Sequence, residues 1–510
     1  MRKWLPLTAV CLGAFMLLVD VTIVTVALPD MATSLHTTFA DLQWVMDVYA
    51  LALAALLLGA GSLADLIGRR KVYLAGLGLF ALASLACGLA TGPAMLITFR
   101  GLQGVGGAAM FATTMALLSG AYQGKDRGIA FGVWGAVNGA AAAAGPVLGG
   151  LLTEHLDWRW IFYVNLPVSV LAVLVTLRVV KESRNPHAGG VDLPGMVTFT
   201  LFAGALTYAL IRVGDNGWTS TTTLGLFALS ALSLLAFVVV ELRSSRPMLD
   251  LALFRSPAFV GIMIGGLLLS VAAFSYLVYS SLWLQTVRGM GPVTAGLAML
   301  PMSVVAFVAA AIAGKKLHGA PPRLTVGGGL LLVGVGALLQ TVIGADSTWV
   351  ALAAGLAVTG AGVGLATPAM AAAAMAAVPP ARAGMAGGAL NTARQLGNAL
   401  GIAVLGAVFQ AGLLDSIRSA HAVPDPQGTA DALTGGGAAG VIARAPQSAH
   451  LVHAAFADGL RDTFLVSGVL GLLGGVAVLL LVRTSAAPAA HGPAAAGVPA
   501  QATAREGAQL

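Results

Sequence analysis

The chain has 510 residues, of which 58% are hydrophobic and 9% are charged, whereas soluble globular proteins contain about 25% charged residues. No long polar segment interrupts the apolar runs, so the composition excludes an ordinary soluble protein and indicates a chain that lies in a bilayer. The formal net charge of +7 does not favour a nucleic-acid partner, because Lys and Arg lie in short loops where membrane insertion explains them.

The N-terminus imitates a secretory signal, with Arg2 and Lys3 ahead of an apolar run. That run covers residues 5–29 without a small-x-small cleavage site, whereas signal cores have about 7 to 15 residues. It is therefore predicted to be a transmembrane helix, and a signal peptide is the alternative. The run contains Asp20, and a carboxyl group in a membrane helix requires an explanation.

Further apolar windows follow, each of about 20 residues, the length that crosses a bilayer as a helix. The sequence predicts an all-α polytopic membrane protein of about fourteen spans, at residues 5–29, 43–64, 72–91, 94–118, 128–153, 159–180, 192–212, 221–241, 257–286, 292–314, 324–343, 348–376, 383–412 and 462–482.

The loop charges predict the orientation of these spans. Nineteen of the 27 Lys and Arg residues lie on the side of the N-terminus, six lie on the opposite side, and Arg100 and Arg394 lie inside predicted helices. Positively charged loops stay in the cytoplasm, and an even number of spans places both ends of the chain on one side. Both termini are therefore predicted to be cytoplasmic.

An internal repeat is weakly indicated. The stretches GSLADLIGRRKVYLAGLGL from Gly61 and GKKLHGAPPRLTVGGGLLL from Gly314 share glycine, arginine and glycine at equal offsets, although coincidence is possible in a glycine-rich chain. Transporters are commonly duplicated helix bundles. The predicted units are a six-helix bundle at 1–185, two inserted helices at 186–250, a six-helix bundle at 251–483 with an external loop at 413–461, and a disordered cytoplasmic tail at 484–510.

Six stretches in chain order resemble one family. They are LVDVTIVTVALP from Leu18, GSLADLIGRRK from Gly61, RGLQGVGGA from Arg100, GPVLGG from Gly145, WRWIFYVNLP from Trp158 and NTARQLGNALG from Asn391. Together they resemble the major facilitator superfamily and its fourteen-span drug:proton antiporters. The resemblance implies two six-helix bundles plus two inserted helices in the plasma (inner) membrane, which export amphipathic drugs or antibiotics against proton entry by alternating access.

Asp20 and Arg100 are the residues predicted to couple transport to protons. An aspartate is tolerated in a membrane helix when it faces protein or water, and a carboxyl group that gains and loses a proton can exchange it for a cationic ligand. Asp20 is therefore predicted to face a wet cavity, and a helix–helix hydrogen bond is the alternative. Arg100 keeps its charge, so its role is electrostatic; the resemblance assigns it to proton transfer, and bonding to backbone carbonyls is the alternative.

The loop after the second span contains Gly61, Asp65, Gly68 and Arg69. Asp65 and Arg69 are four residues apart, and the glycines permit close approach and a tight turn. The resemblance implies a latch that stabilises one end state of transport. The alternative, a plain loop salt bridge, would contribute little stability.

A second motif contains Gly145, Pro146, Gly149 and Gly150. Proline distorts a helix, and small residues let another helix pack closely. In antiporters of the family the matching motif helps to seal the path between the halves, although Ala141 stands where that motif usually has glycine. Simple tight packing is the alternative.

A substrate cavity is predicted only from positions within the spans. Its candidate residues are polar or aromatic: Asp47, Asn138, Tyr276, Tyr279, Gln285, Asn391 and Arg394. Asp47, beside Trp44 and Tyr49, is more readily interpreted as interfacial. For Arg394, substrate contact and helix packing are both open.

Other functions lack their motifs. There is no GxxxxGK[ST] for ATP and no HExxH pair for a metal, so neither an enzyme nor a metal or other cofactor is expected, and the proton gradient is the expected energy source. The expected partners are a small-molecule substrate, protons and lipid. Neither nucleic acid nor ATP is expected as a partner, and the protein is expected to be a monomer. The alternatives are a dedicated exporter of one self-made metabolite or antibiotic and, remotely, a membrane scaffold or enzyme. Cys11 and Cys87 are expected to be packing residues.

Overall fold

The computed structural model describes residues 2–184, 190–316, 320–378, 383–434, 438, 441–442 and 445–482. Some side chains within these ranges, including that of Asn138, lie outside the description. All regular structure in the described part is helical. The predicted tail at 484–510 falls outside it.

The first nine helices are α1 (Leu5–Leu35), α2 (Phe39–Ile67), α3 (Arg69–Gly88), α4 (Pro93–Ala121), α5 (Gly124–His155), α6 (Trp160–Tyr163), α7 (Asn165–Val179), α8 (Leu193–Asn216) and α9 (Thr221–Arg243). They are followed by α10 (Pro257–Phe274), α11 (Leu277–Leu282), a π-helical turn at Trp283–Val287, α12 (Pro292–Lys316), α13 (Pro322–Leu339), α14 (Val350–Ala376), α15 (Ala383–Ala420), the short α16 (Pro426–Ala432) and α18 (Ala449–Leu481).

The described residues contain thirteen helical stretches that are long and apolar enough to cross a membrane. The 32-residue helix α5 covers the remaining predicted span, the fifth. The predicted all-α fold of about fourteen membrane helices is therefore confirmed. The helices α15 and α18 overrun the predicted external loop at both ends, because buried apolar side chains such as Leu413, Ile417 and Val452 continue the helical packing.

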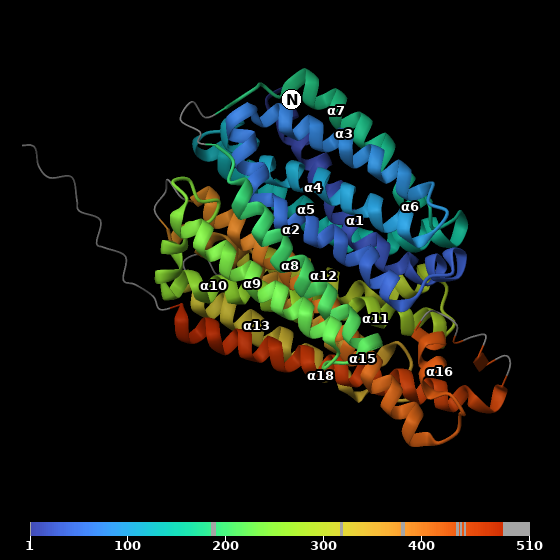
Figure 1. The fold of residues 1–510 in the computed structure, drawn as a ribbon. Helices are drawn as coiled ribbons and strands as arrows, with labels where there is room; N and C mark the ends of the chain where they lie inside the picture. Colours follow the sequence, from blue (N-terminus) through green and yellow to red (C-terminus); the bar gives the residue numbers. More distant parts are fainter. Residues whose placement is uncertain are drawn as a thin grey trace, which may run out of the picture.

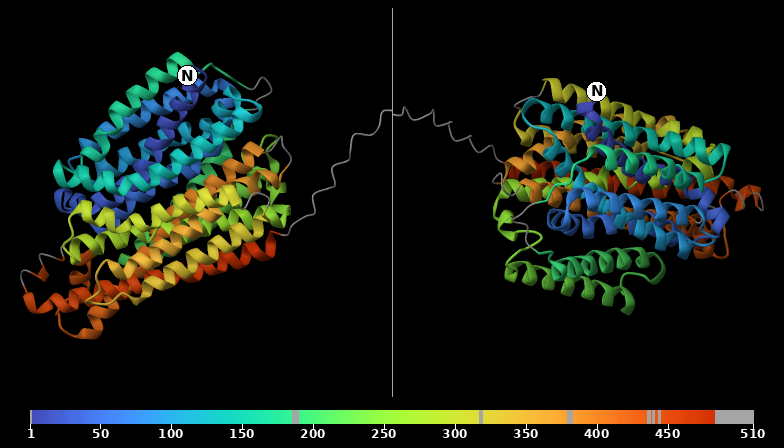
Figure 2. Two further views of the ribbon diagram at one scale, coloured as in Figure 1. Left: turned by 180° about the vertical axis from the view of Figure 1, so that it is seen from behind. Right: turned by 90° about the horizontal axis from the view of Figure 1, so that it is seen from above.

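Three groups of helices are visible in Figure 1. Helices α1 to α7 pack together, α10 to α18 pack together on their other side, and the hairpin of α8 and α9 lies outside both groups, where α8 contacts α2 and α15 (Figure 2). We call the first two groups the N bundle and the C bundle. The exact residues at which the sequence analysis divides these three groups stay a prediction.

The N and C bundles meet through α2 with α15, α5 with α12 and α1 with α11. We name the two ends of the molecule after residues at the two ends of α2, the Asp65 end and the Phe39 end. In the described residues, the hydrogen bonds that join the bundles lie towards the Phe39 end: Gln43 Nε2 donates to the Tyr279 hydroxyl and to the Ile402 carbonyl, Gln285 Nε2 to the Val26 carbonyl, and the Val293 amide to the Glu154 carboxylate.

Equivalent glycine contacts occur in the two bundles. A Cβ on Gly76 of α3 would lie 2.8 Å from the Gly106 carbonyl oxygen of α4, and one on Gly329 of α13 would lie 2.7 Å from the Gly362 carbonyl oxygen of α14. Such contacts bring helix backbones together, as small residues do in membranes. Because Gly76 and Gly329 are paired in the sequence repeat, these contacts support a duplicated bundle.

Gly76→Ala is expected to destabilise the purified protein by about 1–3 kcal/mol, the usual cost of overpacking, because its Cβ would collide with backbone. Gly78 on the same helix has open space at this position, so Gly78→Ala is the matched control and should leave stability unchanged or slightly raised. Thermal unfolding in detergent measures both. Equal melting temperatures for the two variants would contradict the glycine contact.

Candidate functional site

Asp20 and Arg100 form an ion pair inside the N bundle. Asp20 projects from α1 and Arg100 from α4, and Arg100 Nη1 lies 2.6 Å from Asp20 Oδ2. Their side chains are 0% and 1% exposed. Because an isolated charge is very costly away from water, each residue supplies the partner that makes the burial of the other tolerable.

Three polar side chains complete the surroundings of this ion pair. Gln103 Nε2 and Asn165 Nδ2 donate to Asp20 Oδ1 at 2.8 and 3.0 Å. Both amides also donate to the hydroxyl of Ser84, at 3.2 and 3.0 Å, and Gln103 Oε1 accepts from Arg100 Nη1 at 2.7 Å. We call this set the Asp20 cluster: Asp20, Ser84, Arg100, Gln103 and Asn165.

Local structure explains how these side chains meet. Gln103 follows Arg100 by three residues, so both lie on one face of α4. Asn165 begins α7 after the short helix α6 ends at Tyr163. The sequence reasoning did not select Gln103, Asn165 or Ser84. Two features of the sequence could have identified the amides: both lie within motifs named above, and Gln103 is one helical turn from Arg100.

Arg100 has two further kinds of contact. Its Nε donates to the Val45 carbonyl of α2 at 3.1 Å. Its guanidinium lies over the Tyr49 ring, 4.3 Å from the centroid, in a cation–π contact. Arg100 thus donates to a carboxylate and also to a backbone carbonyl, the contact named as its alternative interpretation. Its role in proton transfer stays a prediction.

The expectation that Asp20 faces a wet cavity is wrong for this conformation. Asp20 is fully buried and accepts hydrogen bonds from Arg100, Gln103 and Asn165, so the alternative, a hydrogen bond between helices, describes it here. The sequence could not place Arg100 against Asp20, because the two residues are 80 positions apart and meet only through helix packing.

At the Asp65 end, Arg69 Nε donates to Asp65 Oδ1 at 2.8 Å, so the predicted pair forms. Gly68 has a φ of +122°, which other residues rarely adopt. Nothing lies within 4 Å of a Cβ on Gly61. The expected close approach at Gly61 is therefore wrong, whereas the tight turn at Gly68 is present.

Glu182, which the sequence reasoning did not select, holds this turn against the end of α7. Its two carboxylate oxygens accept from the amides of Arg70 and Lys71, at 3.1 and 3.2 Å. These amides belong to the first turn of α3, where an anion is favoured by the helix dipole. A Cβ on Gly68 would lie 2.7 Å from the Glu182 carboxyl carbon, which is a second reason for glycine there.

The glycine motif of α5 contacts both bundles. Gly145 packs on Thr22 of α1, and a Cβ on Gly149 would lie 2.6 Å from the Ile23 carbonyl oxygen. A Cβ on Gly150 would lie 2.6 Å from the Pro292 carbonyl oxygen of α12 in the C bundle. The carbonyl of Pro146 faces Gly296 of α12. The motif therefore joins the α1 turn that follows Asp20 to the opposite bundle.

The predicted cavity residues do not gather in one place. Tyr276 is buried within the C bundle, where its hydroxyl accepts from Gln340 Nε2 at 3.2 Å. Tyr279 and Gln285 instead lie between the bundles, bonded to Gln43 and to the Val26 carbonyl. Tyr276 is thus a core residue, because the break between α10 and α11 turns it inward.

The remaining candidates differ in their surroundings. Asp47 is fully buried and neither carboxylate oxygen has a hydrogen-bond partner, so the interfacial interpretation is wrong. Arg394 has a buried Nε without a partner and its stem packs near Gly266 of α10. Asn391 is partly buried on the same helix, α15. The side chain of Asn138 lies outside the described part.

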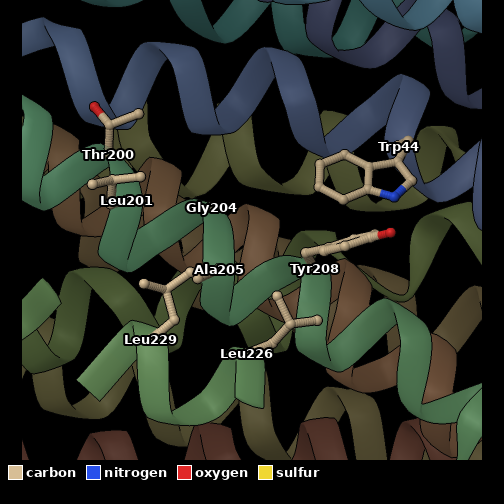
Figure 3. Close-up of a pocket in the computed structure, with 8 residues that line it drawn as sticks. All are labelled: Trp44, Thr200, Leu201, Gly204, Ala205, Tyr208, Leu226 and Leu229. Carbon is tan, nitrogen blue, oxygen red and sulfur yellow. The ribbon is translucent and has the colours of Figure 1, made fainter. Parts of the chain in front are cut away.

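A separate groove of about 420 Å³ lies at the perimeter, between α2 and the α8–α9 hairpin (Figure 3). Its lining is apolar or aromatic, with Trp44 and Tyr208 at one end. None of the predicted cavity residues lines it. Cys11 and Cys87 are buried and unbonded to one another, as expected of packing residues.

Removing either member of the buried ion pair is expected to destabilise the protein by about 3–5 kcal/mol, because the other charge is left without its partner. Asp20→Asn combined with Arg100→Gln should cost less than the sum of the single changes, by about 0.5–3 kcal/mol. Thermal unfolding of the parent, the two single variants and the double variant measures this coupling energy. Asp157→Asn, in a partly exposed pair with Arg159, is the control, and additive losses at Asp20 and Arg100 would argue against a coupled pair.

Comparisons with known proteins agree with this architecture. The chain is 40% identical over 425 residues to the multidrug resistance protein Stp of Mycobacterium tuberculosis (strain CDC 1551 / Oshkosh), covering 83% of this chain and 79% of Stp. It is 32% identical to the tetracenomycin C resistance and export protein of Streptomyces glaucescens, covering 99% and 96%.

Among solved structures, the fold matches a bacterial homolog of the human lysosomal transporter Spinster, with a TM-score of 0.61 at 18% identity over 94% of this chain and 96% of that one. A family model described as Major Facilitator Superfamily matches residues 10–402. The chain therefore belongs to the major facilitator superfamily.

Proposed function

We propose that this protein is a proton-coupled antiporter that exports amphipathic organic compounds, such as drugs or antibiotics, by alternating access across the plasma (inner) membrane. The observation that carries the proposal is the buried Asp20–Arg100 ion pair, at 2.6 Å, inside one of two bundles. Membership of the superfamily and relatives named as multidrug resistance and export proteins support it. Both termini are cytoplasmic in this proposal, which makes the Asp65 end the cytoplasmic end.

Proton binding at Asp20 would act through charge. A protonated Asp20 no longer attracts Arg100, yet Arg100 keeps its positive charge and stays buried. The cluster then favours a rearrangement in which Arg100 finds water or another partner, since an uncompensated buried charge costs several kcal/mol. Because Arg100 occupies the cation position beside Asp20, a cationic substrate does not bind this carboxylate in the present conformation.

The α5 motif offers a route from this event to the bundle interface. Gly145 and Gly149 contact Thr22 and Ile23, directly after Asp20 on α1, while Gly150 contacts α12 of the C bundle. A shift of α1 would therefore alter the seal between α5 and α12. The hydrogen bonds that join the bundles at the Phe39 end support an inward-facing state. The Asp65–Arg69 pair, the proposed latch, is formed in this state.

The energy source in this proposal is the proton gradient alone, without ATP, metal or other cofactor, and the working unit is a monomer. The superfamily and its fold are those of transporters of small molecules, which are not enzymes in general. No catalytic role is therefore proposed.

Uptake of a fluorescent cationic dye into everted membrane vesicles with an acidic interior tests the coupling, because the cytoplasmic face of the protein then lies outside. Gradient-driven transport is expected in the parent and is expected to fall at least tenfold in Asp20→Asn at equal expression, because the proton-binding carboxyl is removed. Asp157→Asn, outside the cluster, should transport like the parent. Equal transport by the parent and Asp20→Asn would assign Asp20 a structural role only.

A dedicated exporter of one self-made compound is the second candidate, favoured by the relative named for tetracenomycin C, which this chain matches over 99% of its length. A panel of unrelated dyes and antibiotics, measured in the same vesicles, separates the two. Transport of several scaffolds is expected for the multidrug exporter. Transport confined to one scaffold would favour the dedicated one.

A further inference from the structure

Asp47 is a second buried acid, in surroundings opposite to those of Asp20. Its side chain is 0% exposed, and both of its carboxylate oxygens lack a hydrogen-bond partner. Asp20 has a cation at 2.6 Å and two amide donors. In the described part of the chain no cation within 4.0 Å pairs with Asp47, because the ion pairs there join other residues.

The surroundings of Asp47 determine the form that this group takes. A buried carboxylate without a counterion or donor is far more costly than the neutral acid, so the group keeps its proton instead. Asp47 is therefore protonated in this conformation.

We propose that Asp47 is a second proton-binding site, which holds a proton while the Phe39 end is closed and loses it when that end opens. The proton moves between the Asp47 carboxyl group and the water that reaches it, and no other bond changes. This inference rests on the proposed function for its use in transport, but the protonation itself can be measured without transport.

The closure over Asp47 is built from contacts between the bundles. Gln43 lies one helical turn from Asp47 on α2, and its Nε2 donates to the Tyr279 hydroxyl at 3.3 Å. The Tyr279 ring stacks on Phe409 of α15, with 5.3 Å between centroids, and Phe39 packs against both rings. We call Phe39, Gln43, Tyr279 and Phe409 the Phe39 lid.

Gly406 makes this lid possible. A Cβ on Gly406 of α15 would lie 2.6 Å from the Tyr279 hydroxyl and still closer to Gln43 Nε2. A larger side chain there would force Gln43 and Tyr279 apart. Separation of the bundles at this point would bring water to Asp47, where the charged form is solvated and the proton can leave.

The groups that face Asp47 offer it no compensating charge. From its own helix there is the neutral amide of Gln43, and from α11 the phenol of Tyr279, which is near enough to interact with Asp47 electrostatically. The element opposite, α15, presents the Ile402 carbonyl and Gly406 to the same lid residues. Arg100 is directed to the Asp20 cluster and to the Val45 carbonyl.

Infrared spectroscopy of the purified protein at neutral pH tests the protonation directly. Glu241 is also buried, and one of its carboxylate oxygens lacks a partner, so the measurement is made in a Glu241→Gln background. Protein with Asp47 is expected to show the carbonyl stretch of a protonated carboxylic acid there, which Asp47→Asn removes. Asp157→Asn should retain it. Asn is close in size to Asp, so Asp47→Asn should remain folded, as circular dichroism would verify. An unchanged band in folded Asp47→Asn would overturn the proposal.

Gly406→Leu tests the link to the lid. Forced opening of the lid should remove the same infrared band. It should also make a cysteine introduced by Ser280→Cys, at a buried position, reactive to a water-soluble maleimide. Cys11 and Cys87 are buried and give little background labelling. A band that persists in protein with a labelled cysteine would refute proton release on opening.

The transport consequence is separate. Asp47 gives its proton to the water at the Phe39 end, the external end in the proposed function, and takes it back from the same side, so it carries no net proton across the membrane. The dependence of transport on membrane potential should therefore be the same in the parent and in Asp47→Asn. A potential dependence that changes in Asp47→Asn would contradict exchange on one side only. If the parent shows no proton-driven transport at all, the proposed function fails, while the infrared result still decides the state of Asp47.

Discussion

The structure of the N bundle depends on the need to neutralise a charge that lies far from water. Asp20 and Arg100 satisfy this need for each other, Gln103 and Asn165 donate to the other oxygen of the carboxylate, and the Ser84 hydroxyl accepts from both amides. The five residues come from α1, α3, α4 and α7. The ion pair joins α1 to α4, and its hydrogen bonds extend the contact to α3 and α7. A change of charge within the pair therefore affects all four helices.

The Asp20 cluster also lies close to α5, the helix that contacts both α1 and the opposite bundle. α5 packs by its glycines on Thr22 and Ile23 of α1 and on Pro292 of α12, so little side-chain material separates the ion pair from the other bundle. Close-packed interiors transmit displacement because they cannot absorb it by compression. Proton binding and bundle movement are thereby linked through backbone contacts, without the need for a substrate to touch Asp20.

Asp20 and Asp47, the acids that are 0% exposed among the described residues, differ in their surroundings. Asp20 has donors and a cation, whereas Asp47 lies one helical turn from the lid residue Gln43 and has no partner for either oxygen. The first is sensitive to the packing of α4, the second to the opening of the Phe39 lid. Two aspartates thus respond to two different movements, that of α4 and that of the Phe39 lid, since burial and hydrogen-bond partners differ between them.

The sequence by itself determined the all-α membrane fold and the approximate number of spans, because a span is a local property of about 20 consecutive residues. It also determined the loop motif of Asp65 with Arg69, because residues four apart in a helical turn are close in space as well. It also selected Asp20 and Arg100, since charges in apolar runs are conspicuous. Only the tertiary structure decided that these two residues pair, that Asn165 and Glu182 complete their sites, that Tyr276 is core, and that Asp47 is sealed without a partner. Contacts between helices depend on the rotation of each helix about its axis, which apolar runs in a bilayer leave nearly unspecified, because every face of such a helix is compatible with lipid.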